Sequence, residues 1–181
     1  MVCHVCPWWG GYFIDNRFRR LLHKPEIILA PYVRDGMTAM DIGCGMGFFS
    51  IAMAKMVGDA GRVIAVDVQQ KMLDVLQERA RKAGVADRIR THRCEPDLLG
   101  IDETVDFALA FYAAHEVPDL RRLLSQTHGC LGPNGKFLVT EPRFHVWART
   151  FDRMIETGED IGLRMLETPR VCLSRSVVFG R

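Results

Sequence analysis

Apolar residues along the chain follow two spacings, one typical of strands and one typical of helices. Short apolar runs predict strands over 38–42, 62–67, 88–93, 105–111 and 136–141. Apolar residues spaced by three or four predict helices over 48–57, 70–83, 118–131 and 147–161. Strands therefore alternate with helices from residue 38 to about residue 161. This alternation is typical of an α/β fold with a doubly wound, mostly parallel sheet.

The two ends of the chain depart from this alternation. Residues 17–30 have helical spacing, and Pro25 is expected to kink or restart that helix. Residues 163–168 and 172–179 predict two more strands with no helix between them, so we expect them to pair antiparallel. Residues 132–135 (GPNG) predict a turn before the fifth strand.

The length indicates a single domain, residues 1–181, and the proportions of hydrophobic and charged residues are those of an ordinary globular protein. The 24 basic and 22 acidic residues leave a net charge of +2, too small to indicate nucleic acid as a partner. No apolar run reaches the ~20 residues that cross a bilayer, so no membrane span is expected. We expect a monomer or a homodimer.

Six cysteines raise the question of disulfides or a metal site. No secretory signal precedes them, so we expect reduced thiols in a cytoplasmic protein. Cys3 and Cys6 form one C-x-x-C, but a zinc site usually needs a second such pair or a histidine pair. We therefore expect no metal.

A glycine-rich loop follows the first predicted strand and opens a helix. Its residues read Asp41-Ile-Gly-Cys-Gly-Met-Gly-Phe48, a G-x-G-x-G spacing. Glycines let the backbone turn tightly and approach a ligand at the carboxyl end of a strand. A dinucleotide fingerprint would need glycine where Phe48 stands. A nucleoside ligand without a pyrophosphate is therefore the better fit.

Asp67 ends the second predicted strand, 20 residues after Gly47. A carboxylate at that place can accept hydrogen bonds from both hydroxyls of a ribose. The glycine loop and Asp67 together favour a nucleoside site over a glycine-rich turn without a ligand.

At this point the sequence resembles the class I S-adenosylmethionine-dependent methyltransferases over residues 25–181. The motifs that carry the resemblance are MDIGCGMGFFS at 40–50, VIAVDVQQKML at 63–73, VDFALAFYAAHEVPD at 105–119 and LGPNGKFLVTEP at 131–142. Within the family, the chain is most similar to the branch of quinone-biosynthesis and arsenite methyltransferases. The resemblance implies a Rossmann-like seven-stranded sheet, mostly parallel with an antiparallel last strand. It also implies S-adenosylmethionine as cofactor and S-adenosylhomocysteine as product.

The resemblance also implies roles for the cofactor-binding residues. The loop residues that would pass under the methionine and ribose parts of the cofactor are Gly43, Cys44, Gly45 and Gly47. Asp41 would orient this loop or contact the amino group of the cofactor. Asp67 would hold the ribose hydroxyls, with Val68 beside the adenine. Phe111 and Tyr112 would form the floor of the pocket.

One position departs from the family pattern. Relatives often carry Gly-Asp-Ala after the third strand, where the aspartate binds the adenine amino group. Arg93-Cys94-Glu95 stands there in this chain. A thiol cannot accept that hydrogen bond as a carboxylate does, so Glu95 or a backbone carbonyl is expected to take the role beside Cys94.

Methyl transfer from a sulfonium is an in-line displacement, in which the protein positions the acceptor and excludes water. His115 follows the fourth strand and is the candidate base, with Glu116 as a second candidate catalytic residue. The alternative is that both residues only pack or cap the next helix. Glu141 ends the fifth strand and either faces the pocket rim or only terminates the strand.

The aromatic run 8–13 is a candidate lid within an N-terminal segment, 1–30, that precedes the core, 36–181. Tyr12 is its expected cofactor contact, because aromatic rings attract a sulfonium. The alternative is that these aromatic side chains pack against the sheet edge or form a dimer surface.

These features predict a methyltransferase for a small-molecule acceptor. The Asn-Pro-Pro-Tyr motif of nitrogen-directed nucleic-acid methylation is absent after the fourth strand, where Phe111-Tyr-Ala-Ala114 stands. A thiophilic acceptor such as arsenite would need several cysteines near the sulfonium. The alternatives are an NAD(P)-binding oxidoreductase and a non-catalytic module that binds S-adenosylmethionine.

Overall fold

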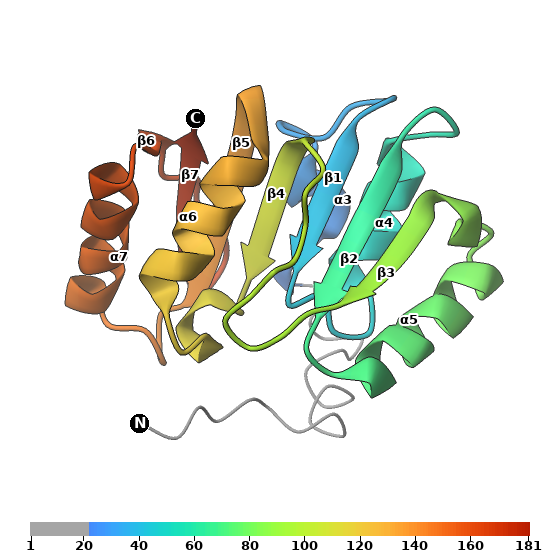
Figure 1. Cartoon of the computed structure of the whole chain (residues 1–181), viewed down its shortest axis with the longest axis horizontal. Helices are drawn as coiled ribbons and strands as arrows, with labels where there is room; N and C mark the ends of the chain where they lie inside the picture. Colours follow the sequence, from blue (N-terminus) through green and yellow to red (C-terminus); the bar gives the residue numbers. More distant parts are fainter. Residues whose placement is uncertain (1–21) are drawn as a thin grey trace.

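The computed structural model describes residues 22–181, which form a sheet in the order β3-β2-β1-β4-β5-β7-β6 (Figure 1). In chain order the elements are α3 (Pro25–Leu29), β1 (Thr38–Ile42), α4 (Phe48–Met56), β2 (Arg62–Asp67), α5 (Gln70–Lys82), η1 (Ala86–Arg88), β3 (Ile89–Arg93), β4 (Val105–Phe111), η2 (Ala114–Glu116), α6 (Leu120–Cys130), β5 (Leu131–Pro142), α7 (Ala148–Asp160), β6 (Arg164–Glu167) and β7 (Ser174–Gly180).

The strand pairing confirms the predicted sheet. β1 pairs parallel with β2 and with β4, and the parallel ladders continue to β3 on one side and to β5 on the other. β7 runs antiparallel to both β5 and β6. Because no helix separates β6 from β7, the chain turns back directly and reverses the last strand.

Helices cover both faces of the sheet, so the central strands are buried on both sides. Side chains of α3, α4 and α5 pack with one face, and side chains of α6 and α7 pack with the other. Successive strand residues alternate between the two cores: Ala39 and Ala65 face the first, and Met40 and Ile64 face the second. This two-sided burial explains why the strands read as continuous apolar runs.

The predicted boundaries of two elements were wrong. The helix predicted over 118–131 begins at Leu120, because the Asp119 carboxylate accepts a hydrogen bond from the Arg122 amide and caps it. It ends at Cys130, and β5 begins at once with Leu131. The predicted turn at 132–135 therefore lies inside β5.

The four residues of that predicted turn form an irregularity in the ladder between β4 and β5. Val105 is opposite Leu131, whereas Phe107 is already opposite Lys136, so the register shifts across residues 132–135. The Gly-Pro-Asn-Gly segment therefore forms a bulge within β5 and not a turn before it.

The N-terminal part of the described chain begins beside the sheet. Pro25 is the first residue of α3, which confirms that a helix restarts there. The aromatic run 8–13, with Tyr12, lies outside the described residues. Among residues 22–181, no helix is long and apolar enough to cross a membrane.

Candidate active site

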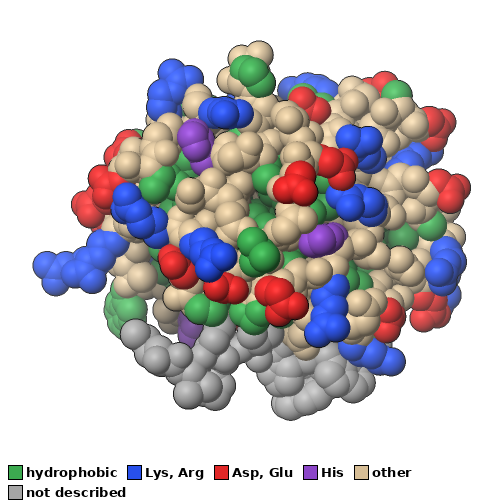
Figure 2. Space-filling view, viewed as in Figure 1, with side chains coloured by type: hydrophobic (Ala, Val, Ile, Leu, Met, Phe, Trp, Pro, Cys, Tyr) green, Lys and Arg blue, Asp and Glu red, His purple; other side chains and the backbone are tan. Residues whose placement is uncertain are grey.

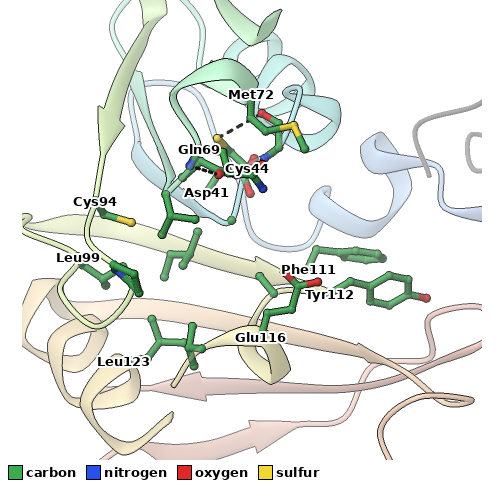
Figure 3. Close-up of a pocket in the computed structure, with 18 of the residues that line it drawn as sticks. Asp41, Cys44, Gln69, Met72, Cys94, Leu99, Phe111, Tyr112, Glu116 and Leu123 are labelled. Carbon is green, nitrogen blue, oxygen red and sulfur yellow. Dashed lines mark hydrogen bonds between the residues drawn. The ribbon is translucent and has the colours of Figure 1, made fainter. Parts of the chain in front are cut away.

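A cavity of about 330 Å³ opens at the carboxyl ends of the parallel strands (Figure 3). Residues at or just after the ends of β1, β2 and β4 line it, including Gly43, Asp67 and Tyr112. The sheet order reverses direction between β1 and β4, and ligands of open α/β sheets bind at such a switch point. The cavity is therefore where the sequence predicted the nucleoside site.

The glycine loop after β1 is held close to neighbouring backbone. The Gly43 amide donates to the Val66 carbonyl at 2.8 Å. Gly43 has a φ of +68°, and a Cβ atom there would lie 2.5 Å from the Cβ of Ala113. Gly45 has a φ of +52°, yet a Cβ there would meet no atom within 4 Å. Gly43 thus lets the loop pack against residues after β4, and Gly45 leaves open space in the cavity wall.

Two buried carboxylates organise this loop. Asp67 is 7% exposed, and its carboxylate accepts hydrogen bonds from the amides of Gly45 and Gln69, both at 2.9 Å. Burial raises the pKa of Asp67 against the lowering effect of these amide bonds. Asp41 accepts a hydrogen bond from the Ser50 hydroxyl at 2.5 Å, which ties the end of β1 to α4. A carboxylate has about four acceptor sites, and the amides of Gly45, Gln69 and Val68 occupy three, which leaves acceptor capacity for a ligand hydroxyl.

Two thiols, those of Cys44 and Cys94, line the cavity close to Asp67. Burial raises the pKa of Cys44 well above its ordinary value, and the charges of Asp41 and Asp67 act in the same direction. Burial raises the pKa of Cys94 to about 11, and Asp67 adds to the effect. Both side chains are therefore thiols rather than thiolates at neutral pH. Figure 3 shows Cys94 and Leu99 together on one side of the pocket.

A strained residue, Tyr112, follows β4 and lines the cavity. Tyr112 has a φ of +61°, a backbone conformation that side chains rarely adopt. Its amide donates to the Thr140 carbonyl at 2.8 Å, and its hydroxyl lies 2.6 Å from the Ser174 hydroxyl. Its ring also contacts Phe111, with centroids 4.5 Å apart. These contacts from β5 and β7 hold the strained turn in place.

The buried Glu141 pairs with the partly exposed His115 at the cavity rim. The His115 Nδ1 atom lies 2.5 Å from Oε2 of Glu141, and the His115 amide donates to Oε1 at 3.2 Å. The Glu141 side chain is 1% exposed, and that of His115 is 18% exposed. Burial lowers the pKa of His115, but the Glu141 hydrogen bond and charge, helped by Glu116, outweigh this and leave it raised.

This pair fixes the tautomer of the neutral His115 ring. Because Nδ1 donates to Glu141, Nε2 of the neutral ring carries the free lone pair. Glu116 also lines the cavity, and Figure 3 shows its side chain extending from η2 toward Phe111. The arrangement can accept a proton at Nε2 and stabilise the resulting imidazolium ion through Glu141.

The structure brings most of the predicted site residues to one cavity. The predicted residues that line it are Asp41, Gly43, Cys44, Gly45, Asp67, Val68, Cys94, Glu95, Phe111, Tyr112, His115 and Glu116. Gly47 lies outside this lining, at the N-cap of α4, where a Cβ would lie 2.7 Å from Leu76. Tyr12 is outside the described residues. The binding roles of all these residues stay predictions.

Several residues that line the cavity were not predicted from the sequence. Among them are Gln69, Met72, Leu99, Leu123 and Gln126. Met72 and Leu123 fall within the segments predicted as helices, 70–83 and 118–131, and periodicity alone cannot tell a core side chain from a cavity wall. The contact between His115 and Glu141 could have been predicted, because the parallel pairing of β4 with β5 places the ends of these two strands side by side.

Several known proteins that are similar to this chain are methyltransferases. Residues 33–167 match the family model described as a methyltransferase domain. A demethylmenaquinone methyltransferase of Lactobacillus johnsonii is 33% identical over 110 residues, covering 60% of this chain and 45% of that protein. A ubiquinone/menaquinone biosynthesis C-methyltransferase of Cellvibrio japonicus is 31% identical over 135 residues, covering 72% of this chain and 54% of that protein. The chain spans about half the length of these curated relatives.

A solved structure shares the whole fold. A SAM-dependent methyltransferase from Aquifex aeolicus superposes with a TM-score of 0.86 at 24% identity, covering 97% of this chain and 98% of that one. The family model covers well over half of the chain, and the sheet order, the reversed last strand and the glycine loop agree with it. The chain therefore belongs to the class I S-adenosylmethionine-dependent methyltransferases.

Proposed function

We propose that this chain transfers the methyl group of S-adenosylmethionine to a small-molecule acceptor that loses a proton during the reaction. Family membership supports the cofactor, and the His115–Glu141 pair supports the proton transfer. The names of the quinone-biosynthesis relatives support a small acceptor.

The residues around the cavity fit the cofactor's chemistry. Asp67 offers carboxylate lone pairs to ribose hydroxyls from the end of β2. Val68, Met72 and Leu99 give an apolar wall suited to a purine. The open space at Gly45 leaves room for a ligand against the loop. Glu95, which also lines the cavity, is the proposed acceptor for the adenine amino group.

S-adenosylmethionine supplies an electrophilic methyl group when it is bound. The chain's own residues then have two tasks. The cavity walls at Phe111 and Tyr112 exclude water and orient the acceptor. His115 Nε2 receives the acceptor's proton, and Glu141 stabilises the charge that forms on the ring.

The single observation that carries the substrate class is the 2.5 Å contact between His115 Nδ1 and Glu141 Oε2. A paired histidine base is useful for an acceptor with an ionisable hydroxyl group, such as a phenol or hydroquinone, because ionisation makes the oxygen or the ring nucleophilic. A thiophilic acceptor is less well served, since Cys44 and Cys94 are protonated thiols.

Further features of the proposal concern the chain as a whole. We place the enzyme in the cytoplasm, as a monomer or homodimer, with residues 36–181 as the catalytic core. The segment 1–30 acts as the lid, and Tyr12 contacts the cofactor. NAD is not the ligand, because the bulky Phe48 stands where a dinucleotide loop needs glycine and lines the cavity.

Parallel calorimetric titrations with S-adenosylmethionine, S-adenosylhomocysteine and NAD test the cofactor. Binding of both adenosyl ligands without NAD is the expected result, and NAD binding would overturn the proposal. Transfer of labelled methyl from S-adenosylmethionine to a tailless naphthohydroquinone, a catechol and a small thiol then tests the acceptor class. Transfer only to the thiol would overturn the phenolic class, and cofactor binding without transfer to any acceptor would favour a non-catalytic module.

A further inference from the structure

Two aromatic side chains beside the cavity rim are exposed to solvent. Phe144 is 83% exposed and Trp147 is 75% exposed, in the loop between β5 and α7. Between them, Val146 is buried and fixes the loop to the core. Large exposed apolar side chains that lie close together on a surface are characteristic of an interaction site. The pair is therefore presented outward by a loop that is itself anchored.

A third exposed apolar residue joins this surface from the turn just before β7. Leu173 is 46% exposed, and its carbonyl accepts a hydrogen bond from the Arg143 amide at 3.0 Å. The Arg143 side chain also donates through Nε to the Ser174 carbonyl at 2.9 Å. These two hydrogen bonds link the start of β7 to the loop between β5 and α7. We name Phe144, Trp147 and Leu173 the aromatic rim.

The surroundings of the aromatic rim are basic. Residues 143–153 and 170–175 contain five arginines and one aspartate, although the whole chain carries a net charge of only +2. Arg149 and Arg153 are exposed and stand one turn apart on α7. Within residues 22–181, neither forms an ion pair with an acidic side chain. Figure 2 shows basic side chains at the edge of the molecule where α7 begins.

The aromatic rim adjoins the active-site cavity directly. Pro142 lines the cavity and starts the turn that carries Phe144. His145 lies between the two aromatic residues in sequence, and its ring packs against His115 with centroids 4.9 Å apart. A surface that engaged the aromatic rim would therefore face the opening of the cavity.

We propose that the aromatic rim and its arginines dock this protein onto an anionic lipid surface. Phe and Trp side chains insert at the boundary between headgroups and acyl chains, and arginines attract anionic headgroups. The charge of the surroundings favours lipid phosphates over a second copy of the chain, whose same surface would be equally basic. Docking would hold the cavity opening against the membrane. This inference concerns a surface and stands whether or not the proposed acceptor class is right.

Vesicle co-sedimentation of the full chain tests the docking. We expect binding to vesicles of phosphatidylcholine with added phosphatidylglycerol, and weaker binding to phosphatidylcholine alone. Phe144→Ser with Trp147→Ser should lower the partition coefficient roughly tenfold or more per ring removed. Ile27→Ser is the matched control, because Ile27 is 66% exposed and belongs to α3 rather than to the loop between β5 and α7. Equal loss in both variants, or no binding by the wild type, would overturn the proposal.

The contribution of the arginines and the insertion of Trp147 into the vesicle are tested separately. Arg149→Glu with Arg153→Glu should remove the preference for anionic vesicles, whereas Lys55→Glu, on α4, should keep it. Trp8→Phe with Trp9→Phe leaves Trp147 as the sole tryptophan, and its emission should shift to the blue on vesicles. An unshifted emission with retained binding would mean that another face docks. A dimer that the aromatic variant converts to a monomer, without vesicle binding in the wild type, would make the rim a contact between copies instead.

Discussion

The Nδ1 atom of His115 lies 2.5 Å from Oε2 of Glu141, and the same carboxylate also accepts the His115 amide. One buried glutamate at the end of β5 therefore fixes both the backbone and the ring of a residue that follows β4. The contact exists because the parallel ladder places Phe111 opposite Thr140, one residue before Glu141. It gives the His115 ring a fixed tautomer and a raised pKa.

Glu141→Gln should lower the pKa of His115. Burial alone lowers this pKa, and the Glu141 hydrogen bond and charge reverse that effect, so their loss leaves the burial effect dominant. A titration of the His115 ring protons by NMR measures the change without any acceptor. An unchanged pKa would show that Glu116 or solvent, rather than Glu141, sets the charge state.

The same substitution should alter stability in a pH-dependent way. Because the folded-state pKa of His115 is raised, the pair's contribution is fully present below the unfolded pKa of about 6.5 and is lost as pH rises through the folded value. Urea unfolding should therefore show a larger loss for Glu141→Gln at mildly acidic pH than at alkaline pH. Glu156→Gln, an exposed position on α7, is the control. A loss independent of pH would mean that the carboxylate acts only by packing.

Asp67→Asn should weaken the binding of S-adenosylmethionine by about 1–3 kcal/mol, the usual cost of losing charge-assisted hydrogen bonds. The amide keeps one oxygen for the Gly45 or Gln69 amide, so the loop should stay folded. Calorimetry measures the dissociation constant, and Asp74→Asn, exposed on α5, controls for a general charge effect. An unaltered constant would remove Asp67 from the ribose role.

Alanine substitutions at three glycines with positive φ distinguish the stability cost of backbone strain from the cost of a steric collision. Gly43→Ala, Gly45→Ala and Gly84→Ala all place a side chain in the left-handed region, at roughly 1–2 kcal/mol each. Only at Gly43 among them does the new Cβ collide, 2.5 Å from Ala113. Gly43→Ala should therefore lose about 1–3 kcal/mol more stability than the other two. Gly45→Ala should match Gly84→Ala in unfolding but bind the cofactor more weakly, since its Cβ enters the cavity wall.

Much of this structure follows from the sequence because the signals are local. Strand 105–111 was visible as an apolar run, and the spacing of apolar residues over 70–83 predicted the helix that forms as α5. The bulge at 132–135 could not be predicted, because a Gly-Pro-Asn-Gly segment suits a turn and a bulge equally well. Only the pairing of this segment with β4 distinguishes the two. The strain at Tyr112 was likewise hidden, since it depends on Ser174, 62 residues away.

Among the cysteines that the structure describes, Cys172 should react first with iodoacetamide. Cys172 is exposed, Cys44 and Cys130 are buried, and Cys94 is partly buried. Burial raises the pKa of Cys44 and Cys94, so at neutral pH both lack the thiolate that alkylation requires. Mass spectrometry of peptides after timed alkylation gives the order. S-adenosylhomocysteine should slow labelling of Cys94 further, because Cys94 lines the cavity, and should leave Cys172 unchanged. Rapid labelling of Cys44 would mean that the glycine loop opens in solution, and the thiophilic acceptor class would then regain support.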